Sequence, residues 1–276
     1  MSIYFYLSPA KINLTLQVLK KRPDGYHEIY SIFQKITLFD EIEIKKASSF
    51  SLDFYSEVAI PVEENLLYKA WKSFKYYFKI SEEIKIKVIK RIPLGAGLGG
   101  GSSNAGTLLK ALCDLYKVEK EKALPIATSL GADVPFFLMD YATAEGKGIG
   151  EILTPFPAYQ AYYLLLYPNL QINTAWAYQQ LNLTNEKSPI KYEASLPPWK
   201  QGSGLINDFK ELIFKNYPQY REYEKALYEE GALAVSLSGT GSTIYGVYEE
   251  PPLFSASRLK KNLNNVKIFV AKNLDL

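Results

Sequence analysis

A dense run of glycines, followed at once by two serines, is the stretch of the chain whose residue types point most directly to chemistry. Five glycines fall within the seven residues 95–101, and residues 102–104 are Ser-Ser-Asn. Glycine has no β-carbon, so its backbone can approach a ligand closely, and exposed N–H groups at a helix start bind anions. So many glycines in so short a run predict a phosphate-binding loop rather than a plain surface turn.

The elements on either side of this run are predicted to position it. Residues 84–88 alternate apolar and lysine side chains, which is typical of a half-buried strand, and Pro93 ends that strand. After the glycines, apolar residues between 105 and 115 recur on one helical face, with residues 102–104 as the expected N-cap oxygens. A strand, a bare loop and a helix N-terminus together favour binding of a phosphate group.

Three familiar phosphate loops can be compared with this pattern. Gly95-x-Gly97-x-x-Gly100 matches the dinucleotide fingerprint, but residues 117–122 read KVEKEK, where that fingerprint needs a strand ending in an acid. A Walker loop needs lysine directly before the Ser/Thr, and that position is Gly101. A protein kinase needs a downstream His-Arg-Asp segment, whereas the single histidine is His27, far upstream.

Composition limits the classes of protein that the chain can belong to. The 276 residues are 47% hydrophobic and carry a net charge of +3, so a sizeable core is expected and nucleic acid is not an expected partner. The single cysteine, Cys113, lies on an apolar helix face and is predicted to be a core residue. The N-terminus lacks a basic, apolar leader and no stretch resembles a membrane span, so we expect no membrane association and a cytoplasmic location.

A polar face runs along the first strand pattern. Residues 3–18 read as strand with an interruption at residues 8–10, after which apolar and polar side chains alternate. Lys11 and Asn13 share the polar face. That face could point to water or line a binding site.

Two further stretches hold residues with chemical potential. A Pro-Asp-Gly turn at residues 23–25 presents Tyr26 and His27 side by side, although such a pair is usually structural. Asp133 lies in the apolar run 131–137, where it is either a helix cap or a site residue, because a charge among apolar neighbours needs a partner.

The remaining stretches alternate between strand and helix patterns. Strands are predicted at residues 31–45, 161–167, 233–237, 243–248 and 266–271, with a glycine-hinged hairpin at 142–152. Helices are predicted at residues 63–78, 174–181, 218–230 and 253–263 and twice between 104 and 130, while residues 184–204 are irregular. The strand-rich first half and the αββαβ finish favour an α+β protein with two lobes.

Three motifs of this chain resemble those of the GHMP kinase superfamily of small-molecule kinases, at residues 8–14, 93–103 and 238–242. Residues 24–28 and 131–137 resemble signatures of the branch that phosphorylates a cytidine-diphosphate sugar alcohol for isoprenoid synthesis. Thr240 stands where the third motif often has serine. The resemblance implies an N-terminal lobe like domain 2 of ribosomal protein S5 and a ferredoxin-like C-terminal lobe, which we expect at residues 1–157 and 158–276.

The resemblance also implies an activity and its partners. The expected donor is ATP with Mg²⁺, the expected acceptor is the cytidyl sugar alcohol, and the chain is expected to be a monomer or weak homodimer. Asp133 is implied as the group that accepts the proton of the attacking hydroxyl, and Lys11 as the group that stabilises the transferring charge. No dedicated protein metal cage is expected.

The remaining site residues implied by the resemblance fall into two sets. ATP is expected at Pro93, Leu94, Gly95, Ala96, Gly97, Leu98, Gly99, Gly100, Gly101, Ser102 and Ser103, with adenine near Asn65 and Leu66. The second substrate is expected at Asn13, Tyr26, His27, Tyr178, Gly239 and Thr240. Trp176 is the alternative to Tyr178 as the second aromatic residue on the base.

Two other functions compete with this one. The first is a GHMP kinase for another small alcohol, such as mevalonate or homoserine, against which the Tyr26-His27 pair argues. The second is a non-catalytic nucleotide-binding protein, which is disfavoured because the chain has both Lys11 and Asp133.

Overall fold

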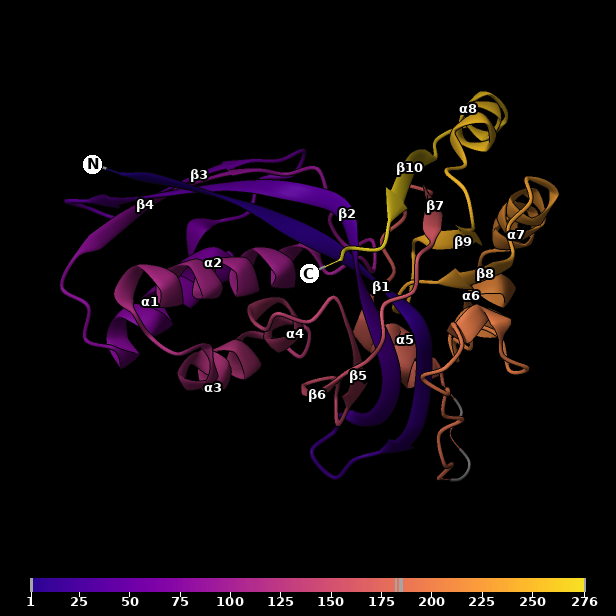
Figure 1. The fold of residues 1–276 in the computed structure, drawn as a ribbon, viewed down its shortest axis with the longest axis horizontal. Coiled ribbons are helices and arrows are strands. Elements are labelled where there is room, and N and C mark those ends of the chain that lie inside the picture. The colour runs from indigo at the N-terminus through magenta and orange to yellow at the C-terminus, as the bar shows by residue number, and fades with distance from the viewer. Residues whose placement is uncertain (1, 182, 184–185, 276) are drawn as a thin grey trace. The chain divides into compact units, whose positions relative to one another are not determined.

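The computed structural model describes residues 2–181, 183 and 186–275, which form two compact units (Figure 1). Unit 1 consists of Met1–Ala10, Leu38–Pro93 and Gly99–Tyr141, and unit 2 of Lys11–Thr37, Leu94–Leu98 and Ala142–Leu276. The glycine run therefore leaves unit 1, contributes residues 94–98 to unit 2 and returns to unit 1 as a helix. The expected domain boundary between residues 157 and 158 is not tested by this division and stays a prediction.

The sheet of unit 1 is built around two long strands. The chain begins with β1 (Ile3–Lys21), which pairs with β2 (His27–Ala47). In unit 1, β2 is antiparallel to β4 (Glu83–Ile89), and β4 is parallel to β3 (Ser51–Tyr55). The expected interruption at residues 8–10 is wrong, because β1 is continuous. Proline fits an extended backbone, and the carbonyl of Pro9 is satisfied by the Ser103 hydroxyl at 2.5 Å.

Helices cover one face of this sheet (Figure 1). They are α1 (Leu66–Tyr77), α2 (Gly100–Tyr116), α3 (Lys120–Leu130) and α4 (Val134–Leu138), and a 3₁₀ turn, η1 (Val62–Glu64), precedes α1. Their apolar sides form one core with Ile42, Ile44, Ile84, Ile86 and Val88 of the strands, and this core includes Cys113 as predicted. The predicted helix at 63–78 begins at Leu66, because Asn65 is its N-cap and accepts a hydrogen bond from Leu67 N at 3.0 Å.

Unit 2 contains a four-stranded antiparallel sheet with helices on one face (Figure 1). Its strands are β7 (Tyr162–Tyr167), β8 (Ala234–Leu237), β9 (Ile244–Tyr248) and β10 (Lys267–Lys272), in the order β10-β7-β9-β8. Its helices are α5 (Thr174–Gln180), α6 (Lys210–Asn216), α7 (Gln219–Glu229) and α8 (Leu253–Asn262). This βαββαβ order confirms the expected ferredoxin-like arrangement; helix α6 was not predicted.

Unit 2 also contains two strands that add to the sheet beside β2. Strand β5 (Thr143–Lys147) pairs with β2 and forms a hairpin with β6 (Ile152–Pro155), which confirms the hairpin predicted at residues 142–152. Residues 184–204 were predicted to be irregular, and their described part contains one short 3₁₀ helix, η2 (Pro198–Lys200). Thr184, the first residue of that prediction, lies outside the described residues. Among the helices of the described chain, none has the length and hydropathy needed to cross a membrane.

Candidate functional site

The glycine run adopts a conformation that only glycine accepts easily. Gly95, Gly97 and Gly99 have φ angles of 66°, 76° and 68°. A β-carbon on Gly97 would lie 2.2 Å from the Ser238 carbonyl oxygen and 2.6 Å from that of Gly241. The loop is therefore bare both because its backbone is left-handed and because other backbone packs directly against it.

Helix α2 begins directly after this loop, and glycine rather than serine caps it. Its N-cap is Gly99, which provides no side-chain hydrogen bond, so the prediction that residues 102–104 supply N-cap oxygens is wrong. Ser102 lies in the first turn, where helical N–H groups have no intrahelical partner, whereas Ser103 N already donates to Gly99 O at 2.8 Å. An uncapped helix N-terminus next to bare backbone is suited to bind an anion.

The two serines of this turn differ in availability. The Ser103 hydroxyl is fully buried, donates to Pro9 O at 2.5 Å and is bonded to the Ser8 hydroxyl at 2.7 Å. The Ser102 side chain is half-buried and makes no hydrogen bond with the part of the chain that the structure describes. Ser102 is therefore the serine that can contact a ligand, and Ser103 fixes the helix to β1.

Within unit 2, the third glycine motif packs against the first half of the loop. The Ser238 hydroxyl donates to Gly97 O at 2.8 Å, and Thr243 N donates to Ala96 O at 3.1 Å. Gly239 N donates to Asn13 Oδ1 at 2.9 Å, and the hydroxyls of Thr240 and Thr174 are 3.3 Å apart. Residues from all three motifs thus meet in this unit.

Lys11 and Asn13 lie in this same group of residues. Lys11 is only 4% exposed, and its ammonium donates to Asn13 Oδ1 at 2.6 Å, while its backbone N–H donates to Leu98 O at 3.0 Å. Asn13 Nδ2 donates to Ser31 Oγ at 2.8 Å, which leaves one of its two amide hydrogens for another acceptor. The polar face of β1 is therefore buried, and the interpretation that it faces water is wrong.

Asp133 belongs to unit 1 and lies at the start of α4. It occupies the N-cap position with a helical backbone, yet its side chain makes no capping hydrogen bond. A capping carboxylate would accept from a backbone N–H two or three residues along the helix. The hydrogen bond that defines a helix cap is therefore missing at Asp133, which disfavours the interpretation of this residue as only a cap.

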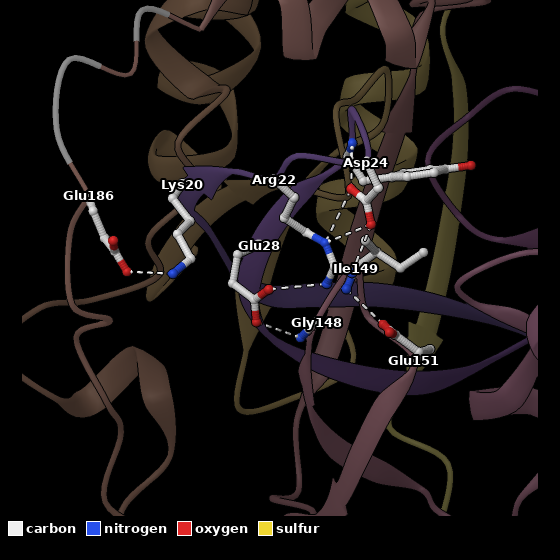
Figure 2. Close-up of polar contacts among 9 residues, drawn as sticks. Lys20, Arg22, Asp24, Glu28, Gly148, Ile149, Glu151 and Glu186 are labelled. Carbon is white, nitrogen blue, oxygen red and sulfur yellow. Dashed lines mark hydrogen bonds and ion pairs between the residues drawn. The ribbon is translucent and has the colours of Figure 1, made fainter.

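A polar network holds the turn that carries Tyr26 and His27 (Figure 2). The Arg22 guanidinium binds Asp24 at 2.8 Å and Glu28 at 3.2 Å, and Asp24 Oδ1 accepts from Tyr26 N at 3.1 Å. Glu28 also accepts from Gly148 N at 3.1 Å, which ties the turn to the β5–β6 hairpin. Tyr26 itself stays 60% exposed, so this network leaves the residue available to a ligand.

The His27 ring stacks on Tyr178, with centroids 5.0 Å apart and planes inclined by 28°. Tyr178 in turn meets Phe209 edge to face at 4.8 Å, which holds its ring in place. Burial lowers the pKa of His27, and the nearby Lys21 lowers it further, so the imidazole is neutral at neutral pH and offers both a donor and an acceptor. The aromatic partner of His27 is thus Tyr178 rather than Trp176.

Asn65 carries an unsatisfied buried donor in unit 1. Its Oδ1 is used by the cap of α1, but its Nδ2 is buried without a hydrogen-bond partner among the described residues. Its neighbour Leu66 lies 3.7 Å from where a β-carbon on Gly101 would be, which places this corner beside the first turn of α2. A buried unpaired amide costs free energy unless a ligand satisfies it.

Comparisons with known proteins agree with this geometry. Residues 65–141 match the N-terminal domain of the GHMP kinases, and residues 194–266 match the C-terminal domain of the same proteins. Fold and glycine motifs therefore define the class as a GHMP kinase with the α+β architecture expected from the sequence.

The relatives are more specific. A 4-diphosphocytidyl-2-C-methyl-D-erythritol kinase of Thermosipho melanesiensis is 41% identical over 87% of this chain and 89% of its own. The enzyme of that name from Thermodesulfovibrio yellowstonii is 38% identical, covering 87% of each chain. A crystal structure of 4-(cytidine 5'-diphospho)-2C-methyl-D-erythritol kinase has a TM-score of 0.82 and 31% identity, covering 98% of both chains. The chain belongs to this family of GHMP kinases.

Proposed function

We propose that the chain is a cytoplasmic, Mg²⁺-dependent kinase that transfers the γ-phosphate of ATP to the 2-hydroxyl of 4-diphosphocytidyl-2-C-methyl-D-erythritol. The observation that carries this proposal is the His27–Tyr178 stack in a GHMP kinase chain, because a cytidyl substrate needs an aromatic base pocket. Relatives named for this substrate, at 35–41% identity, support it. The oligomeric state, a monomer or weak homodimer, stays a prediction.

ATP is held by backbone rather than by charged side chains in this proposal. Residues 93–103 surround its phosphates, the N–H groups of Gly100, Gly101 and Ser102 donate to them, and the start of α2, without a side-chain cap, adds its dipole. The buried, unpaired Nδ2 of Asn65 supports an adenine contact there, with Leu66 against the ring.

The residues present fit a nucleotide-borne Mg²⁺. The proposed ion is held mainly by phosphate oxygens and water, as Mg²⁺ commonly is at nucleotide sites, and so needs few protein ligands. The available hydroxyl of Ser102 is the protein oxygen that would bind it. When bound, the ion neutralises phosphate charge and makes the γ-phosphorus easier to attack.

The chemical step needs a proton acceptor and charge stabilisation. As the 2-hydroxyl oxygen bonds to the γ-phosphorus, the bond to the bridging oxygen of ADP breaks, ADP leaves, and the hydroxyl proton passes to the Asp133 carboxylate. The Lys11 ammonium, oriented by Asn13, offsets the charge on the transferring group. The remaining amide hydrogen of Asn13, together with Gly239 and Thr240, contacts the sugar-alcohol diphosphate.

The base pocket makes a prediction about selectivity. Stacking on a base contributes ~1–3 kcal/mol per aromatic ring, a factor of roughly 5–150. Tyr26→Ala and Tyr178→Ala are each expected to raise KM for the cytidyl substrate by about that factor, with kcat and KM for ATP nearly unchanged. Steady-state kinetics with each substrate varied in turn measure this.

Trp176→Ala is the matched control, because Trp176 is also half-buried against the unit 2 core but is not the partner of His27. It should mainly lower the melting temperature. A larger KM effect from Trp176 than from Tyr178 would show that the wrong aromatic residue has been assigned to the base.

Removal of divalent cations gives another prediction. Excess EDTA is expected to stop ADP formation, and added Mg²⁺ should restore it. Ser102→Ala should raise the Mg²⁺ concentration needed for half-maximal rate by roughly 10–150-fold, since a contact to a charged group contributes ~1.5–3 kcal/mol. Ser103→Ala, the same change one residue along, should instead destabilise the fold by about 1–3 kcal/mol and leave the Mg²⁺ requirement alone. If Ser103→Ala instead raised the Mg²⁺ requirement and Ser102→Ala only destabilised the fold, Ser103 would be the Mg²⁺ contact and Ser102 the structural residue.

The proposed reaction is tested by the product itself. Incubation with Mg-ATP and the cytidyl substrate should yield ADP and a new phosphomonoester. Carbon 2 carries a methyl group and no hydrogen, so ³¹P and ¹³C NMR should show coupling from phosphorus to that methyl carbon. A phosphate on a hydroxyl other than that of carbon 2 would refute the assigned regiochemistry.

A further inference from the structure

A buried polar cluster lies at the point where the glycine run leaves and re-enters unit 1. It consists of Ser8, Asp40, Lys90, Ser103 and Asn104, and we call it the loop anchor. Asp40, Ser8 and Ser103 are fully buried, and Asn104 is 2% exposed. A charge buried this deeply is costly unless partners satisfy it, so the contacts within the loop anchor indicate what holds it in place.

The Asp40 carboxylate joins the two sides of the glycine run. Its Oδ1 accepts from Arg91 N at 2.7 Å and from Ile92 N at 2.9 Å, directly before Pro93. Its Oδ2 accepts from the Lys90 ammonium and from Asn104 Nδ2, the latter at 2.8 Å. One side chain therefore holds both the segment that enters the run and the helix that leaves it.

Lys90 completes this link and lies beside the first turn of α2. Its ammonium donates to Asn104 Oδ1 at 3.0 Å as well as to Asp40. A β-carbon on Gly100 would be 3.1 Å from Lys90 Nζ and 2.9 Å from Ile92 Cγ2, so the start of the helix is packed directly on these residues. Burial lowers the pKa of Lys90, an effect that Asp40 opposes.

We propose that Asp40 is a positioning residue for phosphate binding: through Arg91, Lys90 and Asn104 it fixes the spacing between the entry strand and α2. This proposal rests on the proposed function, in which the N–H groups at the start of α2 bind the phosphates of ATP. Asp40 itself is fully buried and contacts protein groups, so its effect reaches the nucleotide through the backbone that it holds.

The test compares two ligands that differ only in their phosphates. Dissociation constants for ATP and for adenosine are measured by calorimetry on the full chain. Asp40→Asn keeps an acceptor for Arg91 N and Ile92 N but loses the charge and the acceptor toward α2. We expect ATP to bind about tenfold more weakly, because the loop would adopt its phosphate-binding conformation in only about one tenth of the molecules. Adenosine should bind as before, because it has no phosphates.

Two double variants keep the test valid if the single variant does not fold. Asp40→Asn with Lys90→Met removes the ion pair without leaving a buried charge, and should also weaken ATP alone. Asp40→Asn with Asn104→Asp exchanges the carboxylate and the amide, so Lys90 keeps an anionic partner, and ATP affinity should return. Glu83→Gln is the control, because Glu83 pairs with Lys75 and Trp71 in the same unit without contacting the loop anchor.

A merely structural role for Asp40 predicts something else. In the folded Asp40→Asn/Lys90→Met protein, the affinities for ATP and adenosine would then fall together, or neither affinity would change. Either result overturns the proposal. If the wild-type chain itself bound ATP no better than adenosine, the proposed function would fail too. Weakened ATP alone, with recovery in the exchanged variant, supports the positioning role.

Discussion

Asp133→Asn is expected to lower kcat by roughly 10²–10⁴ while leaving the dissociation constant for ATP nearly unchanged. Asparagine keeps the shape of the side chain but cannot accept the proton of the attacking hydroxyl. The loss should therefore appear in the chemical step, and kcat and kcat/KM for the cytidyl substrate should fall together. Stopped-flow or quenched-flow measurement of a single turnover separates this step from product release.

The alternative for Asp133 is a purely structural contact at the start of α4. In that case Asp133→Asn would leave kcat near normal and lower the melting temperature. Asp140→Asn is a suitable control, because Asp140 is a carboxylate of the same unit that pairs with Lys110 and Lys120. Burial raises the pKa of Asp140, but these two lysines outweigh it and bring the pKa to about 2, so the control also removes a permanent charge.

Gly99→Val is expected to weaken ATP binding by roughly a hundredfold or more. Gly99 has a φ of 68°, which costs a side-chain-bearing residue about 1–3 kcal/mol, and valine is poorly suited to it. If the loop relaxes, the N–H groups at the start of α2 turn away from the phosphates, and each lost bond to a charged group costs another ~1.5–3 kcal/mol. Calorimetric titration with ATP measures the combined effect.

Gly231→Val separates backbone strain from loss of the phosphate site. Gly231 also has a positive φ, 88°, and a β-carbon there would meet no atom within 4 Å, but it follows α7 rather than the glycine run. Both variants should lose some thermal stability, while Gly99→Val alone should lose ATP affinity. Intact ATP affinity in a folded Gly99→Val protein would place the phosphate site elsewhere in the chain.

Local patterns predicted much of the fold. The alternation in residues 84–88 predicted β4, the apolar helical face that follows the glycines predicted α2, and the αββαβ finish predicted an α+β protein. These elements follow from periodicity within one segment, which a sequence displays directly. The ferredoxin-like arrangement was implied by the family resemblance. The cap of α2 was predicted wrongly, because a left-handed glycine ended the loop three residues earlier than the serines suggested.

The site residues that belong to sequence motifs could be predicted, whereas contacts between residues far apart in the sequence could not. The burial of Lys11 and Asn13 depends in part on Gly239, 226 residues beyond Asn13. Asp40 was missed for the same reason, since its partners Lys90 and Asn104 lie 50 and 64 residues away. Asp40 is one of three acids among residues 40–43 of the predicted strand, so nothing in the sequence distinguished it, and its pairing could be found only in the folded chain.

The central claim is the identity of the acceptor, and a competition assay tests it most directly. Equal concentrations of 4-diphosphocytidyl-2-C-methyl-D-erythritol, mevalonate and homoserine are incubated with limiting Mg-ATP, and the products are separated by mass. We expect all of the transferred phosphate on the cytidyl substrate in the wild-type protein, and a slower reaction with the same product in Tyr26→Ala. Phosphorylation of mevalonate or homoserine in preference to the cytidyl substrate would contradict the account.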